Sequence, residues 1–229
     1  MCEDCGCGDP EFVAVDVHEH ILSDNAARAA HLRVHFVEAG VLAINLMGSP
    51  GSGKTAVLEQ TARAYRVAAG SERRLGAVSG DLATDRDARR LNAAGITARE
   101  ITKGSECHLD ARMVHDALHH MPWRGLDTFF IENVGNLVCP AIYDLGQAAN
   151  VVALAVTEGE DKPLKYPVMF RTADLVLLTK IDLLPHLDVD VRAIRDALAR
   201  VMPEPRMIAV SGKTGEGIPE WLAWLESRR

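Results

Sequence analysis

Residues 41–55 read Val-Leu-Ala-Ile-Asn-Leu-Met-Gly-Ser-Pro-Gly-Ser-Gly-Lys-Thr, an apolar run that leads directly into a glycine-rich turn. The turn, Gly48 to Thr55, fits the pattern G-x-x-x-x-G-K-[ST]. Its glycines let the backbone wrap around phosphates so that successive N–H groups point inward, and a helix expected over residues 54–69 adds its positive N-terminal end. A chance glycine-rich turn is the alternative, but a strand before the turn and a helix after it are the context that the motif requires.

The motif assigns a role to its polar side chains. Lys54 is expected to neutralise the β- and γ-phosphates and to stabilise charge on the transferred phosphoryl group. The hydroxyl group of Thr55 is expected to bind Mg²⁺. The whole loop is predicted to bind nucleotide, through Gly48, Ser49, Pro50, Gly51, Ser52, Gly53, Lys54 and Thr55.

Strands and helices alternate along the rest of the chain. Apolar runs predict further strands over residues 75–79, 128–132, 151–156, 175–179 and 207–210. Apolar residues at helical spacing predict further helices over residues 24–39, 85–94, 109–120, 189–201 and 219–226. Continuous apolar strands between helices indicate an α/β fold with a mainly parallel, doubly wound sheet. We expect one P-loop nucleotide-binding domain over residues 21–229, after a short cysteine-rich tail over residues 1–20.

Two carboxylates end predicted strands beside the phosphate loop. Asp81 follows the strand over residues 75–79, and Glu132 closes the strand over residues 128–132. Both are predicted to bind Mg²⁺ with Thr55, because the carboxyl ends of parallel strands meet at the edge where nucleotides bind. Asp81 also helps to hold the ion or the attacking water, which makes it a predicted catalytic residue with Lys54. Ordinary solvated loop acids are the alternative for both.

Two partial motifs favour guanine over adenine. Residues 177–182 read Leu-Leu-Thr-Lys-Ile-Asp and resemble the base-reading pattern N-K-x-D, and Ser-Gly-Lys follows the last predicted strand. A carboxylate at position 182 accepts hydrogen bonds from guanine, and adenine lacks both donors there. The predicted base contacts are Lys180, Asp182, Ser211, Gly212 and Lys213. An ordinary exposed strand end is the alternative for Lys180 and Asp182.

The first cysteine cluster lies near the start of the chain, where Cys2, Cys5 and Cys7 form C-x-x-C-G-C. Three thiolates so close together can surround one soft or borderline metal ion, and the free α-amino group can add a nitrogen donor. That donor set suits square-planar Ni²⁺, and four-coordinate Zn²⁺ is chemically reasonable too. Redox use of C-x-x-C is the rival interpretation, although no thioredoxin-like pattern surrounds it.

The remaining cysteines lie further along the chain. Cys107 and His108 precede the helix expected from residue 109, and Cys139 follows the strand over residues 128–132 by a short loop. Both segments are expected to leave the same edge of the sheet, beside the nucleotide. Two sulfurs and one imidazole make a metal site, completed by water or a second subunit. A buried structural cysteine is the alternative for Cys139.

Charge and hydropathy exclude two partner classes. The formal net charge is -7 and basic residues do not cluster, which argues against nucleic acid as a partner. No apolar run reaches the roughly 18 residues that a membrane span needs, and the chain does not open with a basic-then-apolar secretion signal. We therefore expect a cytoplasmic protein without a membrane partner, in which the cysteines are reduced.

Together these residues resemble the hydrogenase nickel-incorporation GTPases, the HypB family. The resemblance covers nearly the whole chain. It rests on the C-x-x-C-G-C motif and on residues 48–55, 80–85, 106–111, 132–140, 158–167 and 211–217. The urease nickel GTPases share the phosphate loop but lack C-x-x-C-G-C, so hydrogenase is the favoured destination.

The resemblance implies a SIMIBI-type GTPase that acts as a nickel metallochaperone and dimerises when GTP is bound. A HypA-type nickel chaperone and the precursor of the hydrogenase large subunit are the implied partners. It also implies a tight Ni²⁺ site at Cys2, Cys5 and Cys7, and a weaker Ni²⁺ or Zn²⁺ site at Cys107, His108 and Cys139. Two departures stand out: a threonine occupies position 179 instead of the common asparagine, and no long histidine-rich storage tract is present.

The expected mechanism is a switch in which the nucleotide state changes the affinity of the second metal site. Two other functions stay open from the sequence. A zinc-buffering protein would hold nucleotide only structurally, and an ATP-driven enzyme would act on a small molecule and prefer ATP to GTP.

Overall fold

The computed structural model of the protein describes residues 10–67, 73–80, 86–101 and 108–229, with the backbone alone over residues 10–21. The described strands form one seven-stranded sheet in the order β3-β2-β4-β1-β5-β6-β7, and every hydrogen-bonded pair is parallel. The strands are β1 (Leu42–Gly48), β2 (Leu75–Ser79), β3 (Thr97–Glu100), β4 (Thr128–Glu132), β5 (Ala149–Ala155), β6 (Leu175–Thr179) and β7 (Met207–Ala209).

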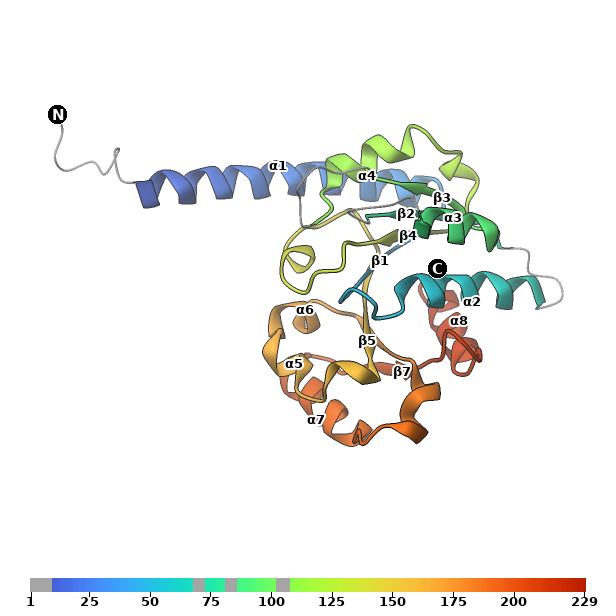
Figure 1. Ribbon diagram of the computed structural model, residues 1–229. Helices are drawn as coiled ribbons and strands as arrows, with labels where there is room; N and C mark the ends of the chain where they lie inside the picture. Colours follow the sequence, from blue (N-terminus) through green and yellow to red (C-terminus); the bar gives the residue numbers. More distant parts are fainter. Residues whose placement is uncertain (1–9, 68–72, 81–85, 102–107) are drawn as a thin grey trace, which may run out of the picture.

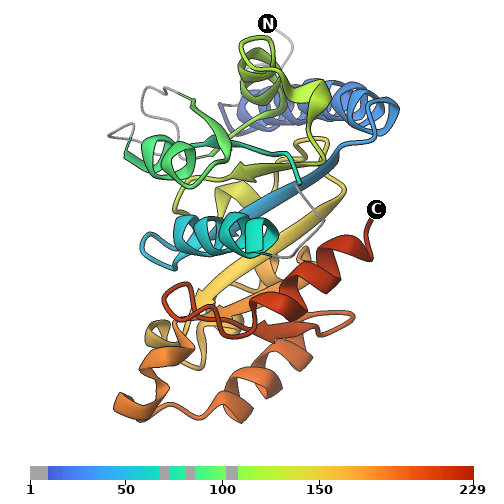
Figure 2. The same ribbon diagram turned by 90° about the vertical axis from the view of Figure 1, so that its right-hand side faces the viewer.

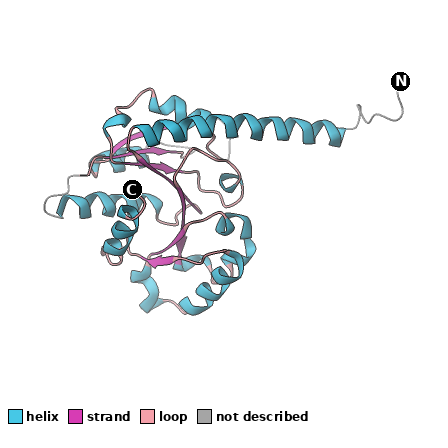
Figure 3. Cartoon of the chain, turned by 180° about the vertical axis from the view of Figure 1, so that it is seen from behind, coloured by secondary structure: helices cyan, strands magenta, loops and turns pink. Residues whose placement is uncertain are grey.

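Helices cover both faces of this sheet, as Figures 1 and 3 show. The α-helices are α1 (Pro10–Glu38), α2 (Lys54–Val67), α3 (Arg86–Ala93), α4 (Ala111–Leu118), α5 (Lys162–Lys165), α6 (Pro167–Arg171), α7 (Val191–Val201) and α8 (Ile218–Glu226). Short 3-10 helices occupy η1 (Trp123–Gly125), η2 (Cys139–Ala141), η3 (Val156–Glu158) and η4 (Ile181–His186). Of the helices that the structure describes, none is long and apolar enough to cross a bilayer.

Alternation along each strand divides the core into layers. Phe130 and Ile44 face α2, α3 and α8, whereas their chain neighbours Phe129 and Ala43 face α1 and α4. A third cluster lies under α6 and α7 and contains Val152 and Leu154 of β5 with Val176 and Leu178 of β6. Side chains on successive strand residues point to opposite faces, so a strand covered on both sides must be apolar throughout. The predicted parallel, doubly wound sheet is confirmed.

Four elements differ from the sequence predictions. β3 was not predicted, because Thr97–Glu100 is polar and half exposed at the sheet edge and lacks an apolar run. The short helices α5 and α6 were also missed. The predicted start of the first helix at residue 24 was wrong, since α1 begins at Pro10. Proline suits a first helical turn, where its missing N–H has no partner to lose. The division between tail and domain near residue 20 stays a prediction.

The described part of α1 is attached to the domain by polar contacts as well as by apolar packing. Asn25 donates to the carbonyl of Asp144 at 2.8 Å and accepts from the backbone N–H of Ala111 at 2.9 Å. Arg33 forms an ion pair with Asp144, in which its Nη2 atom lies 2.7 Å from each of the two carboxylate oxygens. These contacts hold α1 against the first turn of α4 and against the segment before β5.

Candidate functional site

The glycine-rich turn joins β1 to α2 in a conformation that only glycine adopts without strain. Gly48, Gly51 and Gly53 have φ angles of 147°, 71° and 94°, which L-residues rarely adopt. A β-carbon on Gly48 would lie 2.4 Å from the carbonyl oxygen of Ala153 on β5. The loop therefore lies against the end of the neighbouring strand, and it joins a strand to a helix as the sequence predicts.

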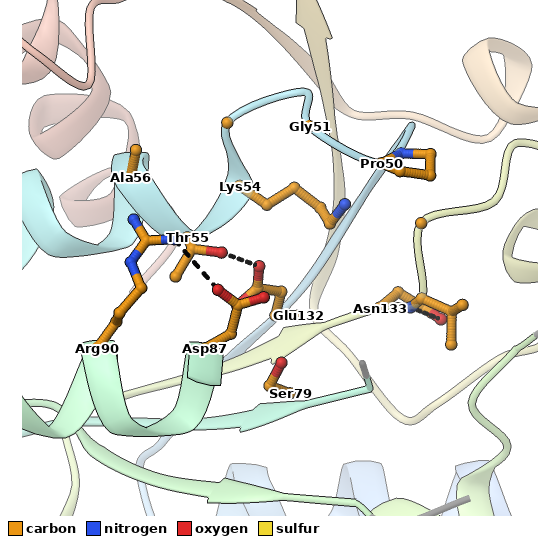
Figure 4. Close-up of a pocket in the computed structure, with 13 residues that line it drawn as sticks. Pro50, Gly51, Lys54, Thr55, Ala56, Ser79, Asp87, Arg90, Glu132 and Asn133 are labelled. Carbon is orange, nitrogen blue, oxygen red and sulfur yellow. Dashed lines mark hydrogen bonds and ion pairs between the residues drawn. The ribbon is translucent and has the colours of Figure 1, made fainter. Parts of the chain in front are cut away.

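Lys54 is buried and its ammonium group lies over the loop. Its Nζ donates to the carbonyl oxygens of Gly48 at 3.2 Å and Ser49 at 3.1 Å. In Figure 4 the side chain reaches across the mouth of the turn toward Pro50. The positive charge therefore already lies where a bound phosphate group would need it.

Glu132, at the end of β4, meets Thr55 at the start of α2. The Thr55 hydroxyl donates to Glu132 Oε1 at 2.7 Å, a contact drawn in Figure 4. Burial raises the pKa of Glu132 to about 7, against the opposing effects of the Thr55 hydrogen bond and the Lys54 charge. Its second oxygen, Oε2, is buried and has no hydrogen-bond partner among the described residues.

This pair of oxygen donors fits a hard divalent cation. Mg²⁺ prefers oxygen ligands and in phosphate sites uses one or two protein groups beside the substrate's phosphates. A buried carboxylate oxygen without a partner costs free energy, and a cation beside it would remove that cost. Thr55 and Glu132 are therefore brought together as the sequence predicts, whereas Asp81 lies outside the described residues.

A cavity of about 430 Å³ opens between the loop, α3 and the segment after β4. Three of its lining residues escaped the sequence analysis: Asp87, Arg90 and Asn133. Arg90 binds Glu59 on α2 through two hydrogen bonds, at 3.0 and 2.8 Å, and Asp87 at 3.1 Å. The positions of Asp87 and Arg90 depend on α3 crossing over the sheet edge, and nothing in the local sequence indicates this.

The segment after β4 lies directly against the phosphate loop. A β-carbon on Gly135 would come within 2.8 Å of Pro50 Cγ and 2.9 Å of its backbone nitrogen. An isolated antiparallel bridge also joins Gly48 to Asn136. Glycine is thus required at position 135 by the close contact between the two loops.

A further carboxylate supports the phosphate loop from η3, the short helix that follows β5. Glu158 accepts a short hydrogen bond from the Ser49 hydroxyl and another from the backbone N–H of Ala155 at 2.8 Å. Lys162 lies 3.4 Å from the same carboxylate. The sequence analysis counted Glu158 in a segment of the family resemblance but gave it no role, because its contact with Ser49 depends on the packing of distant segments.

The residues predicted to read the base lie together at the ends of β6 and β7. The Ser211 hydroxyl donates to Asp182 Oδ1 at 2.6 Å and accepts from the backbone N–H of Lys213 at 3.2 Å. Gly212 packs against α2, where a β-carbon would lie 2.9 Å from that of Ala56. Lys180 has φ of 59°, the left-handed conformation, and so turns the chain between β6 and η4.

Thr179 has a structural role that the sequence did not reveal. The side chain is fully buried, and its hydroxyl donates to the carbonyl oxygen of Ser52 in the phosphate loop at 2.5 Å. The residue that departs from the usual base-reading pattern therefore links the base side of the site to the phosphate side.

Two of the predicted soft-metal ligands are described by the structure. His108 lies on the segment that follows β3 and stacks on Tyr143, with ring centroids 3.8 Å apart, and Cys139 begins η2 after β4. Asn133 connects the two segments, since its Oδ1 accepts from the backbone N–H of Leu109 at 3.3 Å. Within the described ranges, no three His, Cys, Asp or Glu side chains are placed to hold a metal ion. The predicted ligands Cys2, Cys5, Cys7 and Cys107 lie outside those ranges.

Comparison with known proteins identifies relatives that share a nucleotide-binding domain. Residues 42–209 match the family described as CobW/HypB/UreG, nucleotide-binding domain. Hydrogenase maturation factor HypB of Azotobacter chroococcum mcd 1 is 50% identical over 217 residues, which cover 94% of this chain and 69% of that protein.

Two solved structures share the fold. HypB from Helicobacter pylori in complex with nickel has a TM-score of 0.83 and 37% identity, covering 90% of this chain and 94% of that chain. Hydrogenase maturation factor HypB from Archaeoglobus fulgidus has a TM-score of 0.81 and 38% identity, covering 90% and 98%. The expected SIMIBI-type P-loop fold is thereby confirmed. The chain belongs to the HypB family, within the wider CobW/HypB/UreG family of nucleotide-binding domains.

Proposed function

We propose that this protein is a cytoplasmic, GTP-hydrolysing nickel metallochaperone that delivers Ni²⁺ to the precursor of the [NiFe]-hydrogenase large subunit. The observation that carries the proposal is the position of His108 and Cys139 on two segments that leave the sheet at the nucleotide edge. The similarity to a relative named as a hydrogenase maturation factor supports the destination, and the similarity to HypB from Helicobacter pylori, solved in complex with nickel, supports the cargo.

The proposed hydrolysis depends on a positive charge that the protein holds at the phosphate site before nucleotide binds. Lys54 would stabilise the negative charge that develops on the transferred phosphoryl group, because its ammonium already lies over the loop. Mg²⁺, held by Thr55 and Glu132 and by Asp81, would supply further neutralisation of the β- and γ-phosphate oxygens when bound. Asp81 is also the proposed group that positions the attacking water.

Selection of GTP would come from Asp182. Its carboxylate can accept hydrogen bonds from the two donors on the Watson–Crick edge of guanine, and adenine would leave it without them. Ser211 orients the carboxylate at 2.6 Å. Lys180 is proposed to lie along the base and ribose, and the loop of Gly212 and Lys213 to meet the guanine carbonyl.

Coupling between nucleotide and cargo would pass through Asn133. This buried residue lines the cavity, bonds the backbone of Val134 at 2.9 Å and Leu109 at 3.3 Å, and donates to Asn45 Oδ1 at 3.1 Å. A γ-phosphate that moves the segment after β4 would therefore move the residue next to His108. Couplings of this kind are typically worth about 1–3 kcal/mol, or roughly 5–150-fold in affinity.

The proposed assembly follows the family resemblance. A GTP-promoted homodimer would place the second site of each subunit near that of its partner and could complete it. A HypA-type nickel chaperone would work with the protein, Cys2, Cys5 and Cys7 would hold Ni²⁺ tightly, and Cys107, His108 and Cys139 would form the weaker site for Ni²⁺ or Zn²⁺. Metal binding to these thiols would release protons and would therefore weaken at low pH.

The test is Ni²⁺ and Zn²⁺ binding by competition with a chromophoric chelator, with GDP or with a slowly hydrolysed GTP analogue. Wild type is compared with a Cys2/Cys5/Cys7→Ala variant and with His108→Ala. We expect the first variant to lose the tight Ni²⁺ site and to keep a site whose affinity depends on the nucleotide, and His108→Ala to lose that dependence. Zinc-preferring sites that ignore the nucleotide would overturn the proposal and indicate storage.

A further inference from the structure

Four histidines gather where α1 packs on α4, on the side of the sheet away from α2. His31 and His35 are four residues apart on α1, and His115 and His119 have the same spacing at the end of α4. Figures 1 and 2 both show the two helices side by side, and α1 contacts α4 through the apolar residues between them. The sequence analysis assigned no role to this group, because its members belong to segments far apart in the chain.

The imidazole rings form a continuous chain across the two helices. Ring centroids are 4.1 Å apart for His31 and His35, 6.4 Å for His31 and His115, and 4.5 Å for His115 and His119. Two imidazoles that bind one ion at about 2.0–2.1 Å in tetrahedral geometry keep their centroids roughly 5 Å apart. The observed spacings lie on either side of that value, and the site would form by rotation of the side chains while the helices stay in place.

The rings are not yet arranged around one point, since no three potential ligands among the described residues converge on a common centre. Their surroundings nevertheless leave room for rotation. His31 and His119 are exposed, His35 and His115 are half-buried, and His115 lines two adjoining pockets at the helix junction. Exposed or half-buried side chains can change rotamer without disturbing the core.

The electrostatic surroundings of His35 favour its neutral ring, which is the form that binds metal. The pKa of His35 lies below its ordinary value because of burial first, and then because His31, Arg124 and His115 repel a second positive charge. Glu38 on the same helix acts in the opposite direction. On α4, His115 Nδ1 lies 3.6 Å from Asp116 Oδ1.

We propose that α1 and α4 carry a histidine site for one divalent first-row transition-metal ion, with His31, His35 and His115 as ligands and His119 or water as the fourth. Imidazole nitrogen suits Zn²⁺, Ni²⁺ and Cu²⁺ and discriminates poorly among them. Such a site would fasten α1, the helix that follows the cysteine tail in the chain, to α4, which begins three residues after His108. It goes beyond the proposed function, because it uses no thiolate and needs no nucleotide.

The experiment counts Zn²⁺ equivalents bound by the full-length protein, using competition with a chromophoric chelator, in wild type, His31→Ala/His35→Ala, His115→Ala and the control His120→Ala. His120 is exposed just beyond α4 and is not among the proposed ligands. We expect the double variant and His115→Ala to bind one equivalent fewer than wild type, and His120→Ala to bind as many. Equal counts in all four proteins, or the same loss in the control, would overturn the proposal.

Cobalt spectra distinguish this site from the thiolate sites. With Co²⁺ in place of Zn²⁺, the equivalent that the histidine variants lose should lack sulfur-to-metal charge-transfer absorption, and the cysteine-dependent equivalents should remain. Loss of a charge-transfer band would mean that the histidines act through a thiolate site, and the histidine site would be rejected. Circular dichroism checks that alanine, a strong helix former, keeps both helices intact, and His115→Ala tests the site should the double variant fail to fold.

Discussion

Replacing Thr179 with valine tests whether the base side of the site supports the phosphate loop. The two side chains have nearly the same shape, so the change removes the hydroxyl and leaves the packing of β6 in place. In wild type that hydroxyl donates to the Ser52 carbonyl at 2.5 Å, and the threonine is fully buried. The substitution leaves the carbonyl without this donor.

The size of the effect follows from burial. A buried polar group that loses its partner costs about 1–3 kcal/mol. If the loop relaxes in the absence of nucleotide and must be restored on binding, the same free energy appears as a roughly 5–150-fold weaker affinity for GTP. If instead the loop keeps its shape, the free energy of unfolding falls by that amount and the affinity stays near wild type. The loss in the free energy of GTP binding and the loss in the free energy of unfolding should together amount to at least about 1 kcal/mol.

The assays are urea unfolding followed by circular dichroism, and titration with a fluorescent GTP analogue. Thr172→Val is the matched control, because its hydroxyl also donates to a backbone carbonyl, that of Met169 at 3.0 Å, but the side chain is exposed. Water can replace the lost donor there, so a change within about 0.5 kcal/mol is expected. If Thr179→Val and the control behave alike in both assays, the link between the two halves of the site does not exist.

Three further predictions concern the nucleotide site and the packing behind it. Gly135→Ala should weaken GTP binding by about tenfold in nucleotide titrations, because the new β-carbon would lie 2.8 Å from the phosphate-loop proline and such overpacking costs about 1–3 kcal/mol. The control Gly125→Ala, whose β-carbon would have its nearest neighbour at 3.5 Å, should bind GTP as wild type does. Asp182→Asn should reduce the preference for GTP over ATP by at least about tenfold in competition binding, and an unchanged preference would remove this residue from base selection. Tyr65→Phe should lower the free energy of unfolding by about 1 kcal/mol at neutral pH, because it removes the 2.8 Å hydrogen bond to Glu226. Burial and Glu226 raise the pKa of Tyr65 in the folded protein, so the tyrosine's contribution to the free energy of unfolding is complete below about pH 10 and declines as the pH rises toward the folded pKa. The difference in the free energy of unfolding between wild type and the variant, measured with urea, should therefore narrow above about pH 10. A constant difference would contradict the raised pKa.

Local sequence was enough for the features that depend on neighbouring residues. The turn from Gly48 to Thr55 needs glycine where φ is positive, and the strand before it is apolar throughout because both of its faces are buried. Both features can therefore be predicted from the sequence alone. The strand-end position of Glu132 follows from the same logic, because a strand's length places its last residue at the sheet edge. The thiolate ligands of the tail rest on their spacing, and Cys107 rests on the sheet edge expected for its segment; both stay predictions.

The tertiary structure decided which distant residues share a site. The sheet order placed β4 beside β1, which brought Glu132 to Thr55, and the crossing of α3 brought Arg90 into the cavity wall. The same folding directed the Thr179 hydroxyl to the phosphate loop and set the histidines of α1 against those of α4. The physical reason is that periodicity and turn chemistry act over a few residues, whereas these contacts depend on the packing of elements that the chain separates by many residues.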